Sequence, residues 1–148
     1  MRYIEAPTTY SGTEKSLFLG GGITGCPNWQ ASLCSLLRDE DIVLLNPRRA
    51  KFPIEDKNAK KDQILWEFEH LRKAYAISFW FPRESVCPIA LYELGAWSMT
   101  NKQLFVGMDS KYNRRVDVEI QTKLFRPELE VVYSMDALAE RIKVWIRQ

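Results

Sequence analysis

Five short apolar runs recur along the chain at spacings typical of buried strands. They cover residues 16–20, 42–46, 76–81, 103–108 and 129–133. Each run is too short for an ordinary helix, and most are rich in β-branched or aromatic side chains. Because the runs are almost continuously apolar, we expect strands that are buried on both faces, as in a parallel sheet.

Between these runs, apolar residues recur with the period of a helix. Three amphipathic faces are predicted, formed by Trp29, Leu33, Leu36 and Leu37, by Ile64, Leu65, Phe68 and Leu71, and by Met135, Leu138, Ile142, Trp145 and Ile146. The lone histidine, His70, falls on the charged face of the second helix. Two more helices are expected at about 88–100 and 116–125, the first because Pro88 suits a first helical turn.

The alternation of strands and helices predicts an α/β fold built from βαβ units. Five parallel strands in a chain of this length favour a flavodoxin-like, Rossmann-like three-layer sandwich with strand order 2-1-3-4-5. A ligand crevice is then expected at the C-terminal ends of strands one and three, near the loops 20–28, 81–88 and 109–115. We expect one domain over residues 1–148, with residues 1–15 as an N-terminal arm or edge strand.

Composition narrows the classes of function. The chain has 148 residues, a net charge of +2 and 46% hydrophobic residues, which suits one compact domain. The balance of 21 basic and 19 acidic residues gives no reason to expect a polymeric nucleic acid as partner. Without a spanning-length apolar stretch or a signal peptide, we expect a cytoplasmic protein with no membrane partner. Three cysteines without a CxxC pair indicate reduced thiols and no structural zinc site.

The loop after the first strand is rich in glycine. Gly20, Gly22 and Gly25 fit G-x-G-x-x-G, the dinucleotide-binding pattern. That pattern also needs an acidic residue at the end of the second strand, where this chain has Asn46. We therefore favour a plainer interpretation, in which the backbone at Gly20, Gly21 and Gly22 approaches a sugar or phosphate closely. A tight turn that requires glycine explains the loop equally well.

One carboxylate, Glu93, stands in the middle of the apolar run 87–97. Because an unpaired carboxylate is costly to remove from water, this glutamate either faces solvent near a helix N-terminus or has a chemical function. A carboxylate beside a sugar stabilises the oxocarbenium-like state of N-glycosidic bond cleavage, or attacks C1′ to form a glycosyl-enzyme.

Five separated segments resemble the nucleoside 2-deoxyribosyltransferase-like family, in the same order and over most of the chain. They are SLFLGGGITGCPNWQ, LLNPRR, ILWEFEHLRKA, FWFPRESVCPIALYELG and YNRRVDVEIQ. The resemblance implies a flavodoxin-like fold, and it implies that Glu93 in the E-L-G motif is the catalytic nucleophile. It also implies a homo-oligomer whose sites are completed across subunit interfaces. The chemistry needs no metal and no redox cofactor.

The chain departs from the family at two acidic positions. Relatives have an aspartate where this chain has Tyr75, and the true transferases have another acidic residue where it has Cys87. The family aspartate holds or protonates the leaving base, whereas a phenol with an ordinary pKa of about 10 is a poor acid at neutral pH. Tyr75 is therefore either a hydrogen-bond partner of the base or a rim tyrosine, and Cys87 is expected to be a packing residue.

Further residues near the predicted crevice are candidates for holding the base and sugar. Asn28 either binds hydroxyl groups or caps the helix that follows it. Tyr92 can orient the adjacent carboxylate through a hydrogen bond. Trp29, Trp80 and Phe81 either stack on a base or belong to the core.

Basic residues suggest two anion sites. Arg48 and Arg49 follow the second strand, and Arg114 and Arg115 follow the fourth. Arginine forks suit phosphate, so either pair would favour a nucleotide substrate, although exposed arginines are commonly solvated only. Asp117 matches the family motif and either caps its helix or reaches the site of a neighbouring subunit.

Together these features predict an N-glycosyl enzyme that acts on a nucleoside or nucleotide by hydrolysis or transfer. A small-molecule substrate is expected. Two alternatives stay open. One is a catalytically silent module that senses or sequesters a nucleotide, which the replacement at Tyr75 permits. The other is an NAD-type glycohydrolase, because the same chemistry would release nicotinamide.

Overall fold

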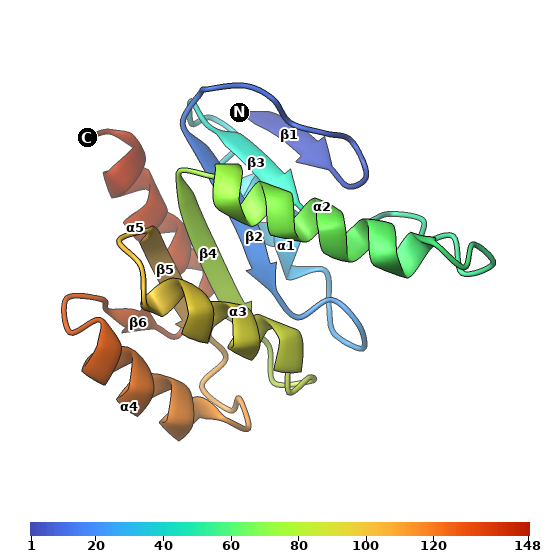
Figure 1. The fold of residues 1–148 in the computed structure, drawn as a ribbon. Coiled ribbons are helices and arrows are strands. Elements are labelled where there is room, and N and C mark those ends of the chain that lie inside the picture. Colours follow the sequence, from blue (N-terminus) through green and yellow to red (C-terminus); the bar gives the residue numbers. More distant parts are fainter.

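A computed structural model describes residues 1–148 and shows a parallel sheet between two layers of helices (Figure 1). The strands lie in the order β1-β3-β2-β4-β5-β6, and every neighbouring pair is parallel. Their bounds are β1 Arg2–Glu5, β2 Ser16–Gly21, β3 Val43–Asn46, β4 Ala76–Phe81, β5 Gln103–Met108 and β6 Val131–Val132.

The flavodoxin-like fold is confirmed, and a sixth strand, β1, forms in the N-terminal segment where an arm or an edge strand was expected. Without β1, the remaining five strands have the order 2-1-3-4-5. The additional strand, β1, pairs with β3 at the edge of the sheet. Only Ile4 is buried in β1, so this strand lacks the continuous apolar character by which the others were recognised. The last strand is shorter than the run 129–133 suggested.

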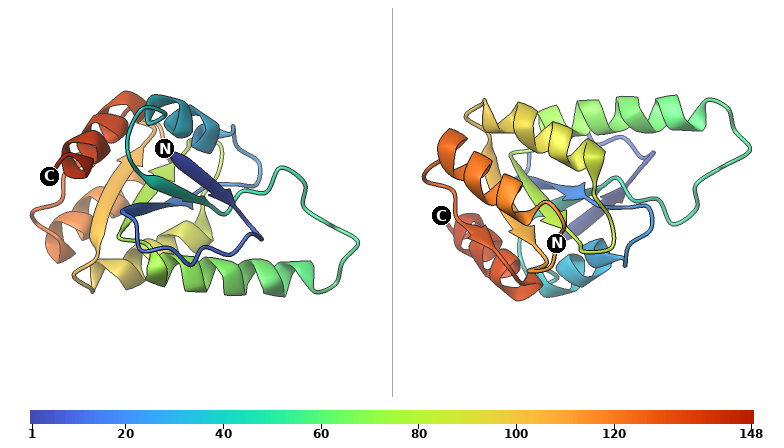
Figure 2. Two further views of the ribbon diagram at one scale, coloured as in Figure 1. Left: turned by 90° about the horizontal axis from the view of Figure 1, so that it is seen from above. Right: turned by 90° about the horizontal axis from the view of Figure 1, so that it is seen from below.

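Helices cover both faces of the sheet (Figure 2). Their bounds are α1 Trp29–Leu36, α2 Ala59–Lys73, α3 Pro88–Ser98, α4 Arg115–Phe125 and α5 Met135–Ile146. Helices α1 and α5 pack on one face, and α2, α3 and α4 pack on the other. None of them combines the length and apolar character needed to cross a membrane.

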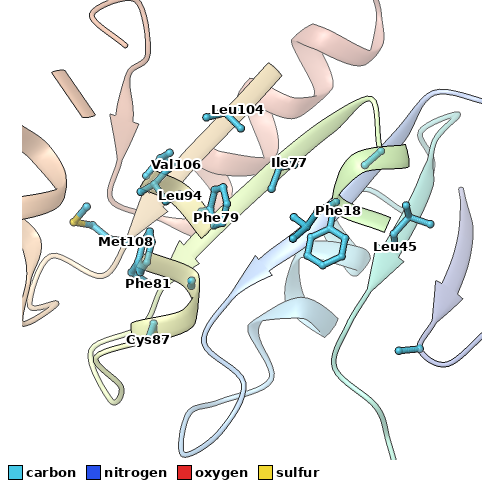
Figure 3. Close-up of a cluster of buried hydrophobic side chains, with 14 of the residues drawn as sticks. Phe18, Leu45, Ile77, Phe79, Phe81, Cys87, Leu94, Leu104, Val106 and Met108 are labelled. Atoms are coloured by element: carbon cyan, nitrogen blue, oxygen red, sulfur yellow. The ribbon is translucent and has the colours of Figure 1, made fainter. Parts of the chain in front are cut away.

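Each central strand contributes to two cores because successive side chains point to opposite faces of a sheet. Phe18, Ile77 and Phe79 face the core under α2, α3 and α4, which Figure 3 shows in close-up. Leu19 and Trp80 face the core under α1 and α5. The prediction that the strands are buried on both faces is therefore confirmed for β2, β3 and β4.

The predicted apolar face of α2 is wrong at three of its four positions, and only Leu71 is buried as expected. Ile64, Leu65 and Phe68 are exposed, whereas Trp66 and His70 are buried. The helix is rotated about its axis relative to the predicted orientation, because the segment between β1 and β2 packs against it and offers polar partners to its buried side. The prediction that His70 lies on the charged face of this helix is wrong for the same reason.

Two side chains of α2 hold the N-terminal segment through hydrogen bonds, an arrangement we call the N-terminal clasp (Thr8, Tyr10, Trp66 and His70). The Trp66 Nε1–H donates to the Thr8 carbonyl at 2.9 Å. His70 Nε2 accepts from the Tyr10 backbone N–H at 2.9 Å, and Nδ1 lies 2.7 Å from the Trp66 carbonyl. One acceptor and one donor nitrogen describe a neutral imidazole. Burial lowers the pKa of His70, which favours the same form.

Candidate active site

A cleft of about 320 Å³ lies at the C-terminal end of β2, between α2 and α3. It is built from β2, the loops after β2, β3 and β4, and the two helices. Its lining residues are Phe18, Gly20, Gly21, Gly22, Ile23, Thr24, Pro47, Glu67, Ser85, Cys87, Pro88, Ile89, Ala90 and Glu93. The cleft occupies the switch point of the strand order, where the sequence predicted a crevice.

Helix α3 brings Glu93 to the cleft from its second turn. The helix begins at Pro88, directly after Cys87, which has a left-handed backbone with φ of 53°. Proline suits this first position because its φ is preset and its missing N–H has no helical partner there. Ala90 and Leu94 are buried on the same side of α3, so the carboxyl of Glu93 is drawn inward with them.

A second carboxyl, that of Glu67, lines the same cleft from α2. Gln63, one helical turn earlier, donates from Nε2 to Glu67 Oε1 at 2.8 Å and to the Pro47 carbonyl at 2.7 Å. This amide therefore fixes the Glu67 side chain against the loop after β3. Gln63 Oε1 is buried and has no hydrogen-bond partner.

The two glutamates, which we call the carboxyl pair, lie in the cleft without a cation, because no lysine or arginine lines it. Burial raises the pKa of Glu93 to about 8, with the negative charge of Glu67 as the second cause. Burial also raises the pKa of Glu67, and the Gln63 hydrogen bond opposes that rise. Burial and the neighbouring negative charge thus both favour a protonated Glu93 near neutral pH.

The glycines that line the cleft are also required by packing. A Cβ atom on Gly21, which has φ of +142°, would lie 2.2 Å from the Trp80 carbonyl oxygen. A Cβ atom on Gly22 would lie 2.9 Å from Cys87 Sγ. The loop thus forms one wall of the cleft and at the same time packs tightly on β4 and the start of α3.

Hydrogen bonds hold this loop in place from the side of α1. The Gly22 carbonyl accepts from Trp29 Nε1 at 2.7 Å and from Gln30 Nε2 at 3.3 Å. Arg48 donates to the carbonyls of Cys26 and Pro27 and to Gln30 Oε1, at distances of 2.9 to 3.2 Å. Its guanidinium therefore braces the loop and does not line the cleft.

Asn28 and Tyr92 lie outside the lining of the cleft. Asn28 caps α1, because its side-chain oxygen accepts from the Ala31 N–H at 3.2 Å. Tyr92 is 79% exposed and does not line the cleft that holds Glu93. The three aromatic candidates Trp29, Trp80 and Phe81 are buried in the cores. The aromatic ring that does line the cleft is Phe18.

Tyr75 lies at the N-terminal ends of the central strands, whereas the cleft lies at their C-terminal ends. It directly precedes β4, and its N–H donates to the hydroxyl of Ser16, the first residue of β2, at 3.3 Å. The cleft is at the other end of these parallel strands. An aspartate at position 75 would be equally remote, so the tyrosine removes no acid from this cleft. The side chain is 56% exposed.

Arg114, Arg115 and Asp117 also lie away from the carboxyl pair. Arg114 and Asp117 form an ion pair at 3.6 Å and line a separate groove of about 220 Å³ between α3 and α4. Arg115 donates to Glu119 at 2.6 Å. The structure therefore brings Glu93 and the glycine loop together and leaves these three residues on another surface.

The loop after β5 meets the loop after β4 without reaching the cleft. Arg83 pairs with Asp109 at 2.8 Å, and the Tyr112 hydroxyl donates to the Val86 carbonyl at 2.6 Å. These contacts support the segment that holds Ser85. The predicted meeting of three loops thus holds for the backbone, while only two of them line the cleft.

Sequence reasoning missed Glu67 and Gln63. Glu67 stands between Trp66 and Phe68, a carboxylate in an apolar frame like that of Glu93. The sequence contained this signal, but the apolar face that we predicted for α2 placed Glu67 on the solvent side of the helix.

Comparison with known proteins identifies the family of the chain. A family model described as nucleoside 2-deoxyribosyltransferase like matches residues 14–112, which is more than half of the chain. The matched part extends from β2 to the loop after β5 and includes both members of the carboxyl pair. No curated protein matches the chain.

Proposed function

The chain belongs to the nucleoside 2-deoxyribosyltransferase-like family, and from this premise we propose that it cleaves or transfers at the N-glycosidic bond of a nucleoside or nucleotide. In this proposal Glu93 is the nucleophile. The substrate occupies the cleft, with its sugar against the loop of Gly20, Gly21 and Gly22.

The observation that supports this proposal is a partly buried carboxyl group in a cleft without a cation. Positive charge develops on the sugar ring as the bond to the base breaks. A carboxylate that has no other counter-charge is free to stabilise this charge, and limited access of water strengthens the attraction. The same carboxylate in an ion pair would gain less from the cationic sugar.

The reaction has two steps in this proposal. An oxygen of Glu93 attacks C1′ while the C1′–N bond breaks, which forms a glycosyl-enzyme ester and releases the base. Water or a second base then attacks C1′, and the Glu93 carboxylate leaves. Attack by water gives hydrolysis, and attack by a base gives transfer.

The cleft suits a compact substrate. Its volume of about 320 Å³ is at the lower end of the range for small-molecule sites. The loop of Gly20, Gly21 and Gly22 offers backbone groups without side chains, and Thr24 and Ser85 add hydroxyl groups to the lining. Such groups are suited to hydrogen bonds with sugar hydroxyls.

The test is a search for free base after incubation with nucleosides, deoxynucleosides, their monophosphates and NAD. Release in water alone indicates hydrolysis, whereas release that needs a second base indicates transfer. Nicotinamide release indicates the NAD glycohydrolase. Tight binding of a nucleotide with no release from any compound would contradict the proposal and favour a silent binding module.

A further inference from the structure

We propose that the N-terminal clasp is a pH-sensitive switch. It holds residues 6–14, in the segment between β1 and β2, against α2 at neutral pH, and it releases them in mild acid when His70 takes up a proton. His70 is the single histidine of the chain, so one side chain can carry the response. No member of the clasp lines the cleft, and the proposal does not depend on the proposed function.

The first support is that both ring nitrogens of His70 already have backbone partners. Nε2 accepts from the Tyr10 N–H at 2.9 Å, and Nδ1 lies 2.7 Å from the Trp66 carbonyl oxygen, to which it donates in the neutral ring. A protonated imidazole has two N–H donors and no acceptor. Protonation would therefore set two N–H groups against each other and break the bond that holds Tyr10.

The second support is burial, because water cannot replace the lost acceptor while the clasp is closed. His70 is 0% and Tyr10 is 1% exposed. The Trp66 indole stacks on the His70 ring, with the ring centroids 3.9 Å apart, and would attract a cation, but this attraction supplies no acceptor for the Tyr10 N–H. A buried donor without a partner is costly, so protonation of His70 and closure of the clasp oppose each other.

The third support is the lack of a counter-charge beside the ring. Burial lowers the pKa of His70 from the usual 6.5, whereas the hydrogen bond to the Trp66 carbonyl raises it. On α2, Lys73 lowers the same pKa and Glu69 raises it, and these two side chains pair with each other at 3.7 Å. Strands β2, β3 and β4 carry no charged residue.

The N-terminal side of the clasp also offers no free carboxylate to the ring. Glu14 accepts from the Tyr10 hydroxyl at 2.9 Å and pairs with Arg2 at 3.0 Å. Glu5, at the end of β1, accepts from the Ala50 N–H at 2.8 Å. A protonated His70 would thus lack a carboxylate partner, and it gains solvation only when the segment opens to water.

The segment is attached weakly enough to open without the rest of the fold. Residues 7–9 and 11–14 are exposed, and the buried side chains of residues 6–14 are Ala6 and Tyr10. The clasp holds it to α2 by the bonds from Trp66 to the Thr8 carbonyl and from Tyr10 to His70. Segments with few buried contacts open at a lower free energy than the core of a sheet.

The direction of the pH response follows from proton uptake. The pKa of His70 in the closed clasp lies below 6.5, the value for a free histidine, so the open form binds the proton more tightly. The clasp is therefore most stable above about pH 6.5 and weakens as pH falls toward the folded pKa. Opening should become up to about tenfold more frequent for each pH unit in this window.

The first experiment is an NMR titration of the imidazole signals, which need no assignment because the chain has one histidine. The midpoint should lie below 6.5, and the nitrogen shifts above the midpoint should show a neutral ring with its proton on Nδ1. A midpoint at or above 6.5, or a proton on Nε2, would overturn the proposal.

The second experiment follows hydrogen exchange of the Tyr10 amide between about pH 5 and pH 8, corrected for the intrinsic rate. Protection should fall by up to about tenfold per pH unit below about 6.5. In His70→Gln, whose side-chain oxygen can accept from the Tyr10 N–H at every pH, protection should not depend on pH. Glu67→Gln is the matched control, because Glu67 is on the same helix and has a raised pKa but lies outside the clasp. It should keep the pH response.

Each other outcome overturns the switch. A response that persists in His70→Gln and disappears in Glu67→Gln would assign it to the cleft. Strands β2 to β5 that lose protection in step with Tyr10 would show unfolding of the whole domain in acid. If His70→Gln does not fold, the unaltered protein decides, because a low NMR midpoint with constant Tyr10 protection would show that the ring titrates without opening the clasp.

Discussion

Helix α3 borders two depressions in the surface. Carboxyl groups have no cationic partner in one of them and form ion pairs with arginines in the region of the other. In the cleft on one side, Glu67 and Glu93 are partly buried, no cation lines the wall, and the pKa of each carboxyl is raised. In the region of α4 on the other side, Arg114 pairs with Asp117 and Arg115 pairs with Glu119. Hydrogen bonds from Tyr133 and Arg115 lower the pKa of Glu119.

The difference indicates where chemistry is expected. An exposed carboxylate that already has a cationic partner gains little from a developing positive charge on a substrate. A partly buried carboxyl without a partner is costly to the fold, and such groups concentrate at functional sites. Four tests probe this contrast, from the largest expected effect to the smallest.

The largest difference in turnover between variants of the two regions is expected for the replacement of Glu93. Glu93→Gln keeps the shape of the side chain but removes its charge, so turnover should fall at least about a thousandfold, or about 4 kcal/mol in the activation barrier. Glu119→Gln, on the α4 side, should leave turnover unchanged. Base release is measured by chromatography for both variants, and retained turnover in Glu93→Gln would refute the glycosyl-enzyme mechanism.

The pH dependence of stability should change with the same substitution. The folded pKa of Glu93, about 8, lies above the value of 4.5 for a free glutamate. Its contribution to stability is therefore fully present below about pH 4.5 and is lost as pH rises through about 8. Relative to the unaltered protein, Glu93→Gln should gain roughly 3 to 5 kcal/mol in unfolding free energy between pH 4 and pH 9. Urea unfolding at several pH values measures this difference. Unfolding free energies that change with pH by the same amount in both proteins would contradict the burial of the Glu93 charge.

Removing the amide that holds Glu67 should have a smaller effect. Gln63→Leu deletes the hydrogen bonds to Glu67 and to the Pro47 carbonyl, at a cost of about 1 kcal/mol in unfolding free energy. Because the amide lowers the pKa of Glu67, its loss should raise that pKa and move any limb of the rate profile that depends on Glu67 to higher pH. A profile that keeps its position would show that Gln63 has only a structural role.

The exposed arginines should matter least. Arg114→Ala combined with Arg115→Ala removes exposed groups that pair on the α4 side, so the unfolding free energy should change little. Nucleoside and monophosphate should lose equally little affinity, as measured by calorimetry. A selective loss of about 1 to 3 kcal/mol for the monophosphate would place these arginines at the substrate.

The sheet could be predicted because each buried strand is an apolar run of its own. The positions of β4 and β5 match the predicted runs, and the strand order follows from a general rule for short parallel sheets. The edge strand β1 could not be recognised in the same way, since one buried side chain in four residues leaves no pattern.

The site was predictable only in part, for physical reasons. Glu93 is detectable because its apolar neighbours in the sequence are also its neighbours in the helix. Glu67 was missed because the rotation of α2 depends on Thr8 and Tyr10, about 60 positions away, and local periodicity does not report such contacts. The bracing role of Arg48 likewise depends on a loop that is distant in sequence.

The N-terminal clasp also bears on how the chain can be shortened. The family match begins at residue 14, so a version trimmed to that boundary would lack β1, Thr8 and Tyr10. The Trp66 indole and the His70 ring would then lose their partners on the helix that presents Glu67. A boundary drawn from sequence similarity alone would thus cut away the support of one of the two carboxyls in the cleft.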